Sequence, residues 1–146
     1  SKGEKEVSID ELLNLAKNYP FLKSVKAVND RKLAQKDLFY SYSYKQFKVD
    51  VIEAFIRKNP NFLILHIAIS NTSNHPLKLI EKNTNVFIHD QSFTPQYVLF
   101  DTSTLNINGK TDGWLVLKDS HISTDNKFEC QISIEEQENV LYTDIS

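Results

Sequence analysis

The segment Phe62–Ile69 constrains the fold of this 146-residue chain more than any other part of the sequence. It is apolar at every position except His66. A strand with one solvated face alternates apolar and polar residues, whereas a strand covered on both faces is apolar throughout. Phe62–Ile69 is therefore expected to be a central strand of a sheet, ending at the turn-forming cluster Ser70–Pro76.

Shorter segments with an alternating, strand-like pattern surround this central strand. From Leu38 onward, Tyr40, Tyr42 and Tyr44 fall on one side and serines on the other. The apolar phase then slips by one residue, which predicts a β-bulge near Ile52–Glu53. The remaining strand candidates are residues 77–80, 85–89, 93–100, 114–117, 128–134 and 140–145. Short strands at this spacing predict a mainly β protein with a sandwich or barrel architecture.

The N-terminal part of the chain has helical spacing instead. Ser8 and Glu11 form a capping-box pattern, which marks the start of a helix. One face of that helix would carry Ile9, Leu12, Leu13 and Ala16. A second short helix is expected to begin near Pro20. Its apolar stripe would be Tyr19, Phe21, Leu22, Val25 and Val28. We therefore expect a tether and helical extension over residues 1–37 and a β domain over residues 38–146.

Composition is ordinary for a globular protein and excludes some partners. Hydrophobic residues make up 40% of the sequence, charged residues 25%, and the net charge is -2. This balance gives no electrostatic reason to expect nucleic acid or an anionic membrane as a partner. No apolar run approaches the ~18 residues of a membrane-spanning helix. Membrane contact is expected only through a lipid anchor upstream of Ser1.

The N-terminal segment Ser1–Glu6 is polar, and the sequence contains no methionine. Such a segment is typical of the tether that follows a removed signal peptide or a lipidated cysteine. A boundary chosen by an experimenter would give the same pattern, and both explanations stay open. The single cysteine, Cys130, makes no intrachain disulfide and does not identify the compartment.

Three segments of the β region follow one another in a characteristic order. They are a central strand and turn at Phe62–Pro76, a hairpin at Phe87–Phe93, and a glycine turn with the next strand at Asn108–Val116. In this order they resemble bacterial immunoglobulin-like extracytoplasmic domains of unknown function, which often occur on lipoproteins. The resemblance implies an immunoglobulin-like antiparallel β-sandwich, export from the cytoplasm and a binding or scaffolding role, with no catalytic residues to transfer. Its glycine turn would lie between Gly109 and Gly113.

Residue types that carry catalysis or bind metals show no familiar spacing here. The histidines are His66, His75, His89 and His121. His66 shares a strand face with apolar residues, so we expect a half-buried, hydrogen-bonded histidine rather than a metal ligand. Cys130 falls in the apolar phase of its strand and is expected to be a core residue rather than a nucleophile. A metal site assembled from His75, His89 and Asp90 is the weaker alternative. The sequence therefore predicts no enzyme, no cofactor and no metal.

Tyr40, Tyr42 and Tyr44 are the candidate binding residues, because aromatic side chains with a polar tip are enriched at interfaces. The competing explanation is that they pack the helical extension onto the sheet or cover its edge. The expected function is a non-catalytic extracytoplasmic binding module with a protein partner, secreted or lipid-anchored in a bacterial envelope. One alternative is a structural subunit of an envelope or secretion assembly, whose helices dock onto another chain. Another is an inhibitor that presents Asp101–Asn108 to an exogenous enzyme.

The triplet Asn71–Ser73 matches the acceptor pattern for N-glycosylation. Turns produce such triplets by chance, and the family resemblance is bacterial. The triplet alone is therefore weak support for a glycan.

Overall fold

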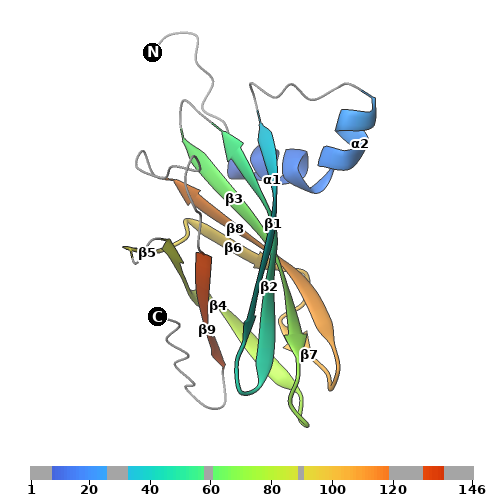
Figure 1. Ribbon diagram of the computed structural model, residues 1–146, viewed down its shortest axis with the longest axis vertical. Coiled ribbons are helices and arrows are strands. Elements are labelled where there is room, and N and C mark those ends of the chain that lie inside the picture. Colours follow the sequence, from blue (N-terminus) through green and yellow to red (C-terminus); the bar gives the residue numbers. More distant parts are fainter. Residues whose placement is uncertain (1–7, 26–32, 58–60, 89–90, 119–129, 137–146) are drawn as a thin grey trace.

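The structure is a computed structural model that describes residues 8–25, 33–57, 61–88, 91–118 and 130–136. In these ranges the chain is mainly β, with two short helices ahead of antiparallel strands (Figure 1). The sequence prediction of a mainly β, antiparallel protein with a short N-terminal helical extension is confirmed at this level. Immunoglobulin-like connectivity stays a prediction.

Both N-terminal helices form where the sequence predicts them. Helix α1 spans Ile9–Lys17, and the Ser8 side chain caps it by accepting from the Glu11 N–H at 3.1 Å. Helix α2 spans Tyr19–Ser24 and has its proline in the first turn, where no N–H is needed. The predicted stripe of α2 is only partly correct. Tyr19 is buried, but Phe21 and Val25 point into solvent with 66% and 54% of their surface exposed.

Within the described ranges, the larger sheet has five strands in the order β1-β2-β3-β8-β6. Their bounds are Ala34–Ser43 for β1, Phe47–Arg57 for β2, Phe62–Asn71 for β3, Lys110–Lys118 for β8 and Tyr97–Phe100 for β6. The predicted apolar strand is β3, and it lies at the centre with β2 and β8 on its two sides. The predicted bulge is also confirmed, because the β2–β3 register shifts between Val51 and Glu53.

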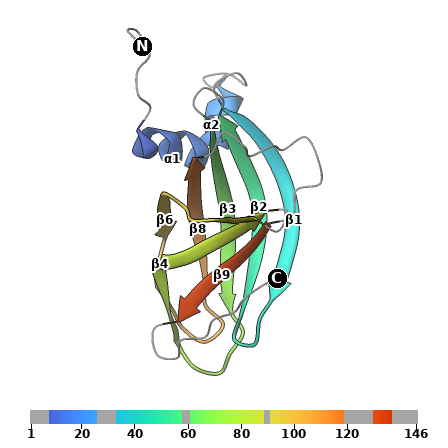
Figure 2. The same ribbon diagram turned by 90° about the vertical axis from the view of Figure 1, so that its left-hand side faces the viewer.

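The smaller sheet is built around β4, which spans Leu77–Ile88. Its partners are β5 (Gln91–Phe93), β7 (Thr104–Leu105) and β9 (Cys130–Glu136). In Figure 2, β4 and β9 lie in front of the larger sheet and cross its strands at an angle. The structure thus has two sheet layers.

A single hydrophobic core fills the space between the two sheets, and we call it the inner core. Alternate residues of the larger sheet enter it, because side chains of a strand alternate between its faces. The smaller sheet contributes Leu77, Leu79, Val86 and Leu105. Sixteen of the residues whose side chains the structure describes are buried in this cluster, so it is large enough to hold the two layers together.

The opposite face of the larger sheet, which we call the outer face, is covered at one end by the helices (Figure 1). Leu12, Leu13 and Ala16 of α1 and Tyr19 of α2 pack there on the sheet. The sheet contributes Phe55, Phe62, Ile64, Trp114 and Val116. This second core explains why β3 is apolar on both faces. The helices and the sheet share buried surface. The division expected after residue 37 marks where the sequence changes from helical to strand-like periodicity.

Several strand boundaries differ from the sequence prediction. Strand β1 begins at Ala34 rather than Leu38. The two segments expected at 77–80 and 85–89 form one continuous strand, β4. The segment expected at 93–100 is instead divided into β5 and β6, with Pro95 between them. Proline has no N–H to donate to a sheet, which explains the interruption.

The predicted turn between Gly109 and Gly113 is wrong. The turn lies at Asn106–Gly109, where the Gly109 N–H donates to the Asn106 carbonyl at 2.7 Å. Asn108 adopts a left-handed φ of 62° there, which asparagine tolerates better than most residues. Gly113 belongs to β8, and a Cβ at this position would lie 2.8 Å from Phe100 Cδ1. It is a glycine because the inner core leaves no room for a side chain.

Some predictions fall outside the described part of the chain. These are the strand at 140–145, Val28, His89, Asp90 and His121. The backbone of Cys130 begins β9, but the predicted burial of its side chain also lies outside what the structure describes. Among the described residues, no helix is long and apolar enough to cross a membrane.

Candidate functional site

Phe39 is the most exposed large apolar residue of the described chain, with 89% of its surface accessible. It lies in β1, which has a neighbouring strand on one side only among the described strands. The β1–β2 register shifts between Asp37 and Tyr40, so a bulge places two β1 residues opposite one residue of β2. Leu38 on one side packs into the inner core, and Phe39 points away from it.

A groove lies beside this bulge. It has a volume of about 370 Å³ and is lined by Leu38–Ser41 and Asp50–Ile52, and we call it the β1–β2 groove. Phe39 forms part of its wall, and the lining is mostly apolar. Single exposed apolar residues are common on protein surfaces, but one that borders an apolar groove is typical of a contact site.

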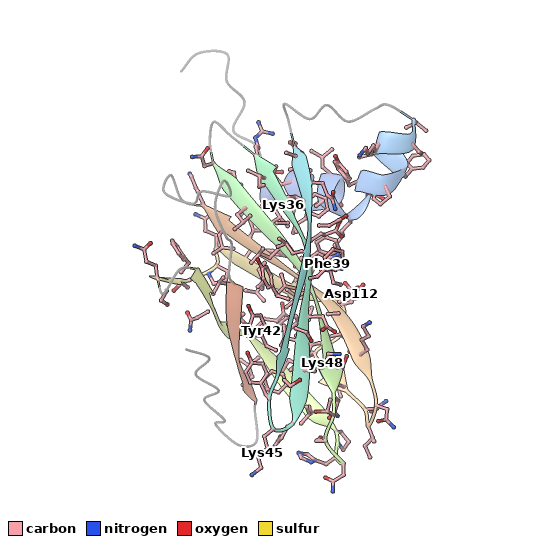
Figure 3. All side chains as sticks on the ribbon, viewed as in Figure 1. Lys36, Phe39, Tyr42, Lys45, Lys48 and Asp112 are labelled. Atoms are coloured by element: carbon pink, nitrogen blue, oxygen red, sulfur yellow. The ribbon has the colours of Figure 1, made fainter. Side chains whose placement is uncertain are left out.

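Figure 3 shows that Phe39, Lys48 and Asp112 lie on the side of the larger sheet that carries the helices, whereas Tyr42 lies toward the smaller sheet. Phe39 therefore belongs to the part of the outer face that the helices leave uncovered. The register of the paired strands identifies the residues around Phe39. One row across β1, β2, β3 and β8 is Asp37, Glu53, His66 and Trp114. The next row is Ser41, Asp50, Ala68 and Asp112.

These two rows hold four carboxylates, one histidine and no lysine or arginine. Asp50 Oδ1 accepts a hydrogen bond from the Ser41 hydroxyl at 2.7 Å, and Lys48 Nζ lies 3.7 Å from the same oxygen. Lys48 belongs to the following row, toward the β1–β2 turn. Trp114 at the end of the first row lies beneath the helices, whereas the part of the rows on β1 and β2, next to Phe39, is uncovered and acidic.

The first row contains a hydrogen-bonded group centred on His66. Its Nδ1 lies 2.6 Å from Glu53 Oε2, and the carboxylate accepts this hydrogen bond. Gln35 Nε2 donates to Glu53 Oε1 at 3.0 Å and to Asp37 Oδ1 at 2.6 Å. On the other side, His66 Nε2 is 3.6 Å from Asp112 Oδ2. That distance suits an electrostatic contact but is too long for a hydrogen bond, which agrees with Nε2 having no hydrogen-bond partner in the structure.

This group lacks the parts that nucleophilic catalysis needs. The nearest polar partners of the two His66 ring nitrogens among the described residues are carboxylates, and a catalytic triad needs a hydroxyl or thiol at one of them. Glu53 and Asp112 approach opposite ring nitrogens, so they do not converge on one point. Among the described residues, no group of three His, Cys, Asp or Glu side chains could hold a metal ion. His66 is half-buried and hydrogen-bonded through Nδ1 as expected, but its Nε2 has no hydrogen-bond partner, so the ring is only partly satisfied.

Tyr40 and Tyr42 occupy the other side of β1, Tyr44 follows directly after the strand, and all three are half-buried against the inner core. The Tyr44 ring lies 4.6 Å from that of Phe47. They pack between the sheets rather than against the helices, which contact the outer face. A partner-binding role for these tyrosines stays a prediction. The segment 101–108 presents Ile107 with 52% of its surface exposed, while Leu105 in β7 is buried.

Sequence reasoning missed Phe39, although the sequence contained a signal for it. Phe39 lies in phase with Ser41 and Ser43, on the polar side of the alternating segment. A large apolar residue among the polar positions of a strand is unexpected unless something covers it. Comparisons of the sequence with protein-family models and with curated proteins find no match.

Proposed function

We propose that this protein is a non-catalytic interaction module, built on an immunoglobulin-like β-sandwich and located outside the bacterial cytoplasm, either secreted or lipid-anchored. Two antiparallel sheets around one core support the sandwich. The order of motifs from Phe62 to Val116 supports the immunoglobulin-like connectivity and the export. The functional argument rests on the surface of the molecule, because a fold alone does not define a function.

The observation that carries the proposal is Phe39, exposed beside the β1–β2 groove on an uncovered part of the sheet. Burying an aromatic side chain and an apolar groove against a partner is favourable, and aromatic residues are enriched in the centres of interfaces. The bulge that exposes Phe39 also interrupts regular strand pairing, as bulges near functional surfaces often do. The surface around Phe39 is therefore suited to binding a partner through side-chain contacts rather than through backbone strand pairing.

Site-specific photo-crosslinking in the native cell tests this proposal. Benzoylphenylalanine is placed at position 39, and at Lys78, an exposed residue of β4, for background. The expected result is a discrete adduct with one other protein from position 39 and none from position 78. Equal labelling from both positions, or no adduct from either, would contradict the proposal.

The same experiment discriminates the two alternative functions. A structural subunit that docks through its helices would use α2 and its C-cap, where Phe21 and Val25 are exposed. An enzyme inhibitor would use the segment 101–108, where Ile107 is exposed. Crosslinker at Phe21 or Ile107 would then give the adduct, and position 39 would not.

Location needs a separate test. Cell fractionation with an antibody against the protein is expected to place it in the periplasm or at the cell surface. The coding sequence upstream of Ser1 is expected to encode a signal peptide, with a cysteine before the tether if the protein is lipid-anchored. Recovery of the protein from the cytoplasm only would rule out the extracytoplasmic part of the proposal.

A further inference from the structure

We infer that the partner presents an apolar side chain flanked by lysine or arginine to the surface around Phe39. This inference rests on the proposed function and specifies the chemistry of its partner. The site consists of Phe39, the β1–β2 groove and the carboxylates of the two neighbouring rows.

The apolar requirement follows from the groove. Its volume of about 370 Å³ lies at the lower end of the range of ligand sites. A groove of this size accepts one or two side chains, not a folded surface. Phe39 at its wall offers an aromatic ring to the entering group, and the ring faces water until something covers it.

The cationic requirement follows from the two rows of residues. Asp37, Glu53, Asp50 and Asp112 place four carboxylates on the same face as Phe39. The hydrogen bonds that reach Asp37 and Asp50 come from the neutral groups of Gln35 and Ser41, so they leave the negative charge in place. Lys48 offsets part of the charge at Asp50. Ammonium or guanidinium groups would make charge-assisted hydrogen bonds to the carboxylate oxygens that remain accessible.

Other occupants fit this chemistry less well. A second copy related by a two-fold axis on this face would oppose one carboxylate cluster with another. Pairing through the free edge of β1 is hindered by the bulge and by the charged residues Lys36 and Asp37, which are common protections of sheet edges. An anionic lipid surface would be repelled by the same carboxylates.

The test uses fluorescein-labelled nonapeptides and the full chain, with fluorescence anisotropy as the measurement. The first peptide alternates lysine with leucine and phenylalanine, the second has glutamate at each lysine position, and the third has serine at each apolar position. Only the first is expected to bind measurably. Its affinity should fall roughly tenfold in Phe39→Ser, as for a central interface residue. It should fall several-fold in the double variant Asp37→Asn/Asp50→Asn.

Matched surface variants show whether binding is local. Ile107→Ser removes a different exposed apolar residue, and Asp101→Asn removes a different exposed carboxylate. Both should bind the first peptide like the unmodified chain. Trp114 fluorescence verifies that every variant is folded. Equal affinity for the lysine and glutamate peptides, or equal losses in the matched variants, would overturn the inference.

The outcomes also separate this inference from the proposed function. A crosslinked partner at position 39 combined with charge-independent peptide binding would overturn the cationic requirement and leave the interaction module in place. Sedimentation that shows a dimer dependent on Phe39 would identify a second copy as the occupant, and would also overturn the inference. No adduct at position 39 together with no effect of Phe39→Ser would contradict both.

Discussion

The imidazole of His66 stacks on the indole of Trp114, with ring centroids 4.0 Å apart and planes inclined by only 4°. The two residues are direct neighbours across β3 and β8. Lys17 of α1 lies over the same indole, with Nζ 5.8 Å from the ring centroid. Trp114 is the only tryptophan of the sequence. Its fluorescence therefore reports on the helical end and on the acidic rows of the outer face at once.

Glu53→Gln is expected to lower the free energy of unfolding by about 1–2 kcal/mol, because it replaces a charged acceptor of the His66 and Gln35 hydrogen bonds with a neutral amide. Urea unfolding followed by Trp114 fluorescence measures the change. Asp101→Asn, at an exposed position, is the matched control and should change stability by less than about 0.5 kcal/mol. Equal effects of both substitutions would show that the Glu53 hydrogen bonds do not stabilise the fold.

Asn71→Ala is expected to cost about 2–3 kcal/mol, because a buried amide that joins separate segments would be lost. Its Nδ2 donates to the carbonyls of His75, Leu105 and Asn106 at 2.9–3.2 Å. Asn71→Asp should cost more, since a carboxylate would face those carbonyl oxygens. Differential scanning calorimetry gives both values. Asn74→Asp makes the same chemical change at an exposed position, and a comparable loss there would contradict this explanation.

Phe39→Ser is expected to leave the free energy of unfolding within about 0.5 kcal/mol of the unmodified chain, since its ring is solvated. Phe55→Ala should cost about 3–5 kcal/mol, because Phe55 is fully buried beneath the helices and packs on Tyr19 with ring centroids 5.4 Å apart. Guanidinium unfolding of the two variants side by side checks the contrast. A large loss for Phe39→Ser would mean that the ring is needed for folding.

Leu12→Ala is expected to lower stability by about 2–4 kcal/mol within a single cooperative transition, because Leu12 is fully buried against the sheet. Thermal unfolding by circular dichroism and by Trp114 fluorescence should give the same midpoint. Asn14→Ala, on the exposed side of α1, should leave that midpoint nearly unchanged. Two separate transitions in Leu12→Ala would show that the helices unfold independently of the sheet.

The sequence pattern predicted those parts of the fold that depend on local periodicity. The unbroken apolar run of β3, the phase slip at Ile52 and the Ser8 cap each leave a signal within a few residues. Boundaries that depend on distant partners were not predictable in this way. The two predicted segments of β4 both pair with β9, on either side of a register shift between Ile80 and Asn85, and Gly113 is required by Phe100 of another strand.

The candidate site was predicted less well than the fold. Alternation correctly divided β1 into a tyrosine side and a serine side. It could not indicate which side faces the second sheet, because that depends on tertiary packing. The tyrosines lie against the inner core, and Phe39 lies with the serines. The acidic rows were invisible in the sequence, since Asp37, Glu53 and Asp112 come together only through strand register.

The buried Asn71 amide has a consequence for the Asn71–Ser73 triplet. In the folded chain its nitrogen is fully engaged with carbonyls, and an oligosaccharyltransferase could not reach it. Glycan attachment and folding at this residue are mutually exclusive. If the chain is expressed through a eukaryotic secretory pathway, the fraction of chains glycosylated at Asn71 would equal the fraction modified before the Asn71–Ser73 turn formed. That fraction would therefore report the rate of folding at this turn relative to the rate of glycosylation.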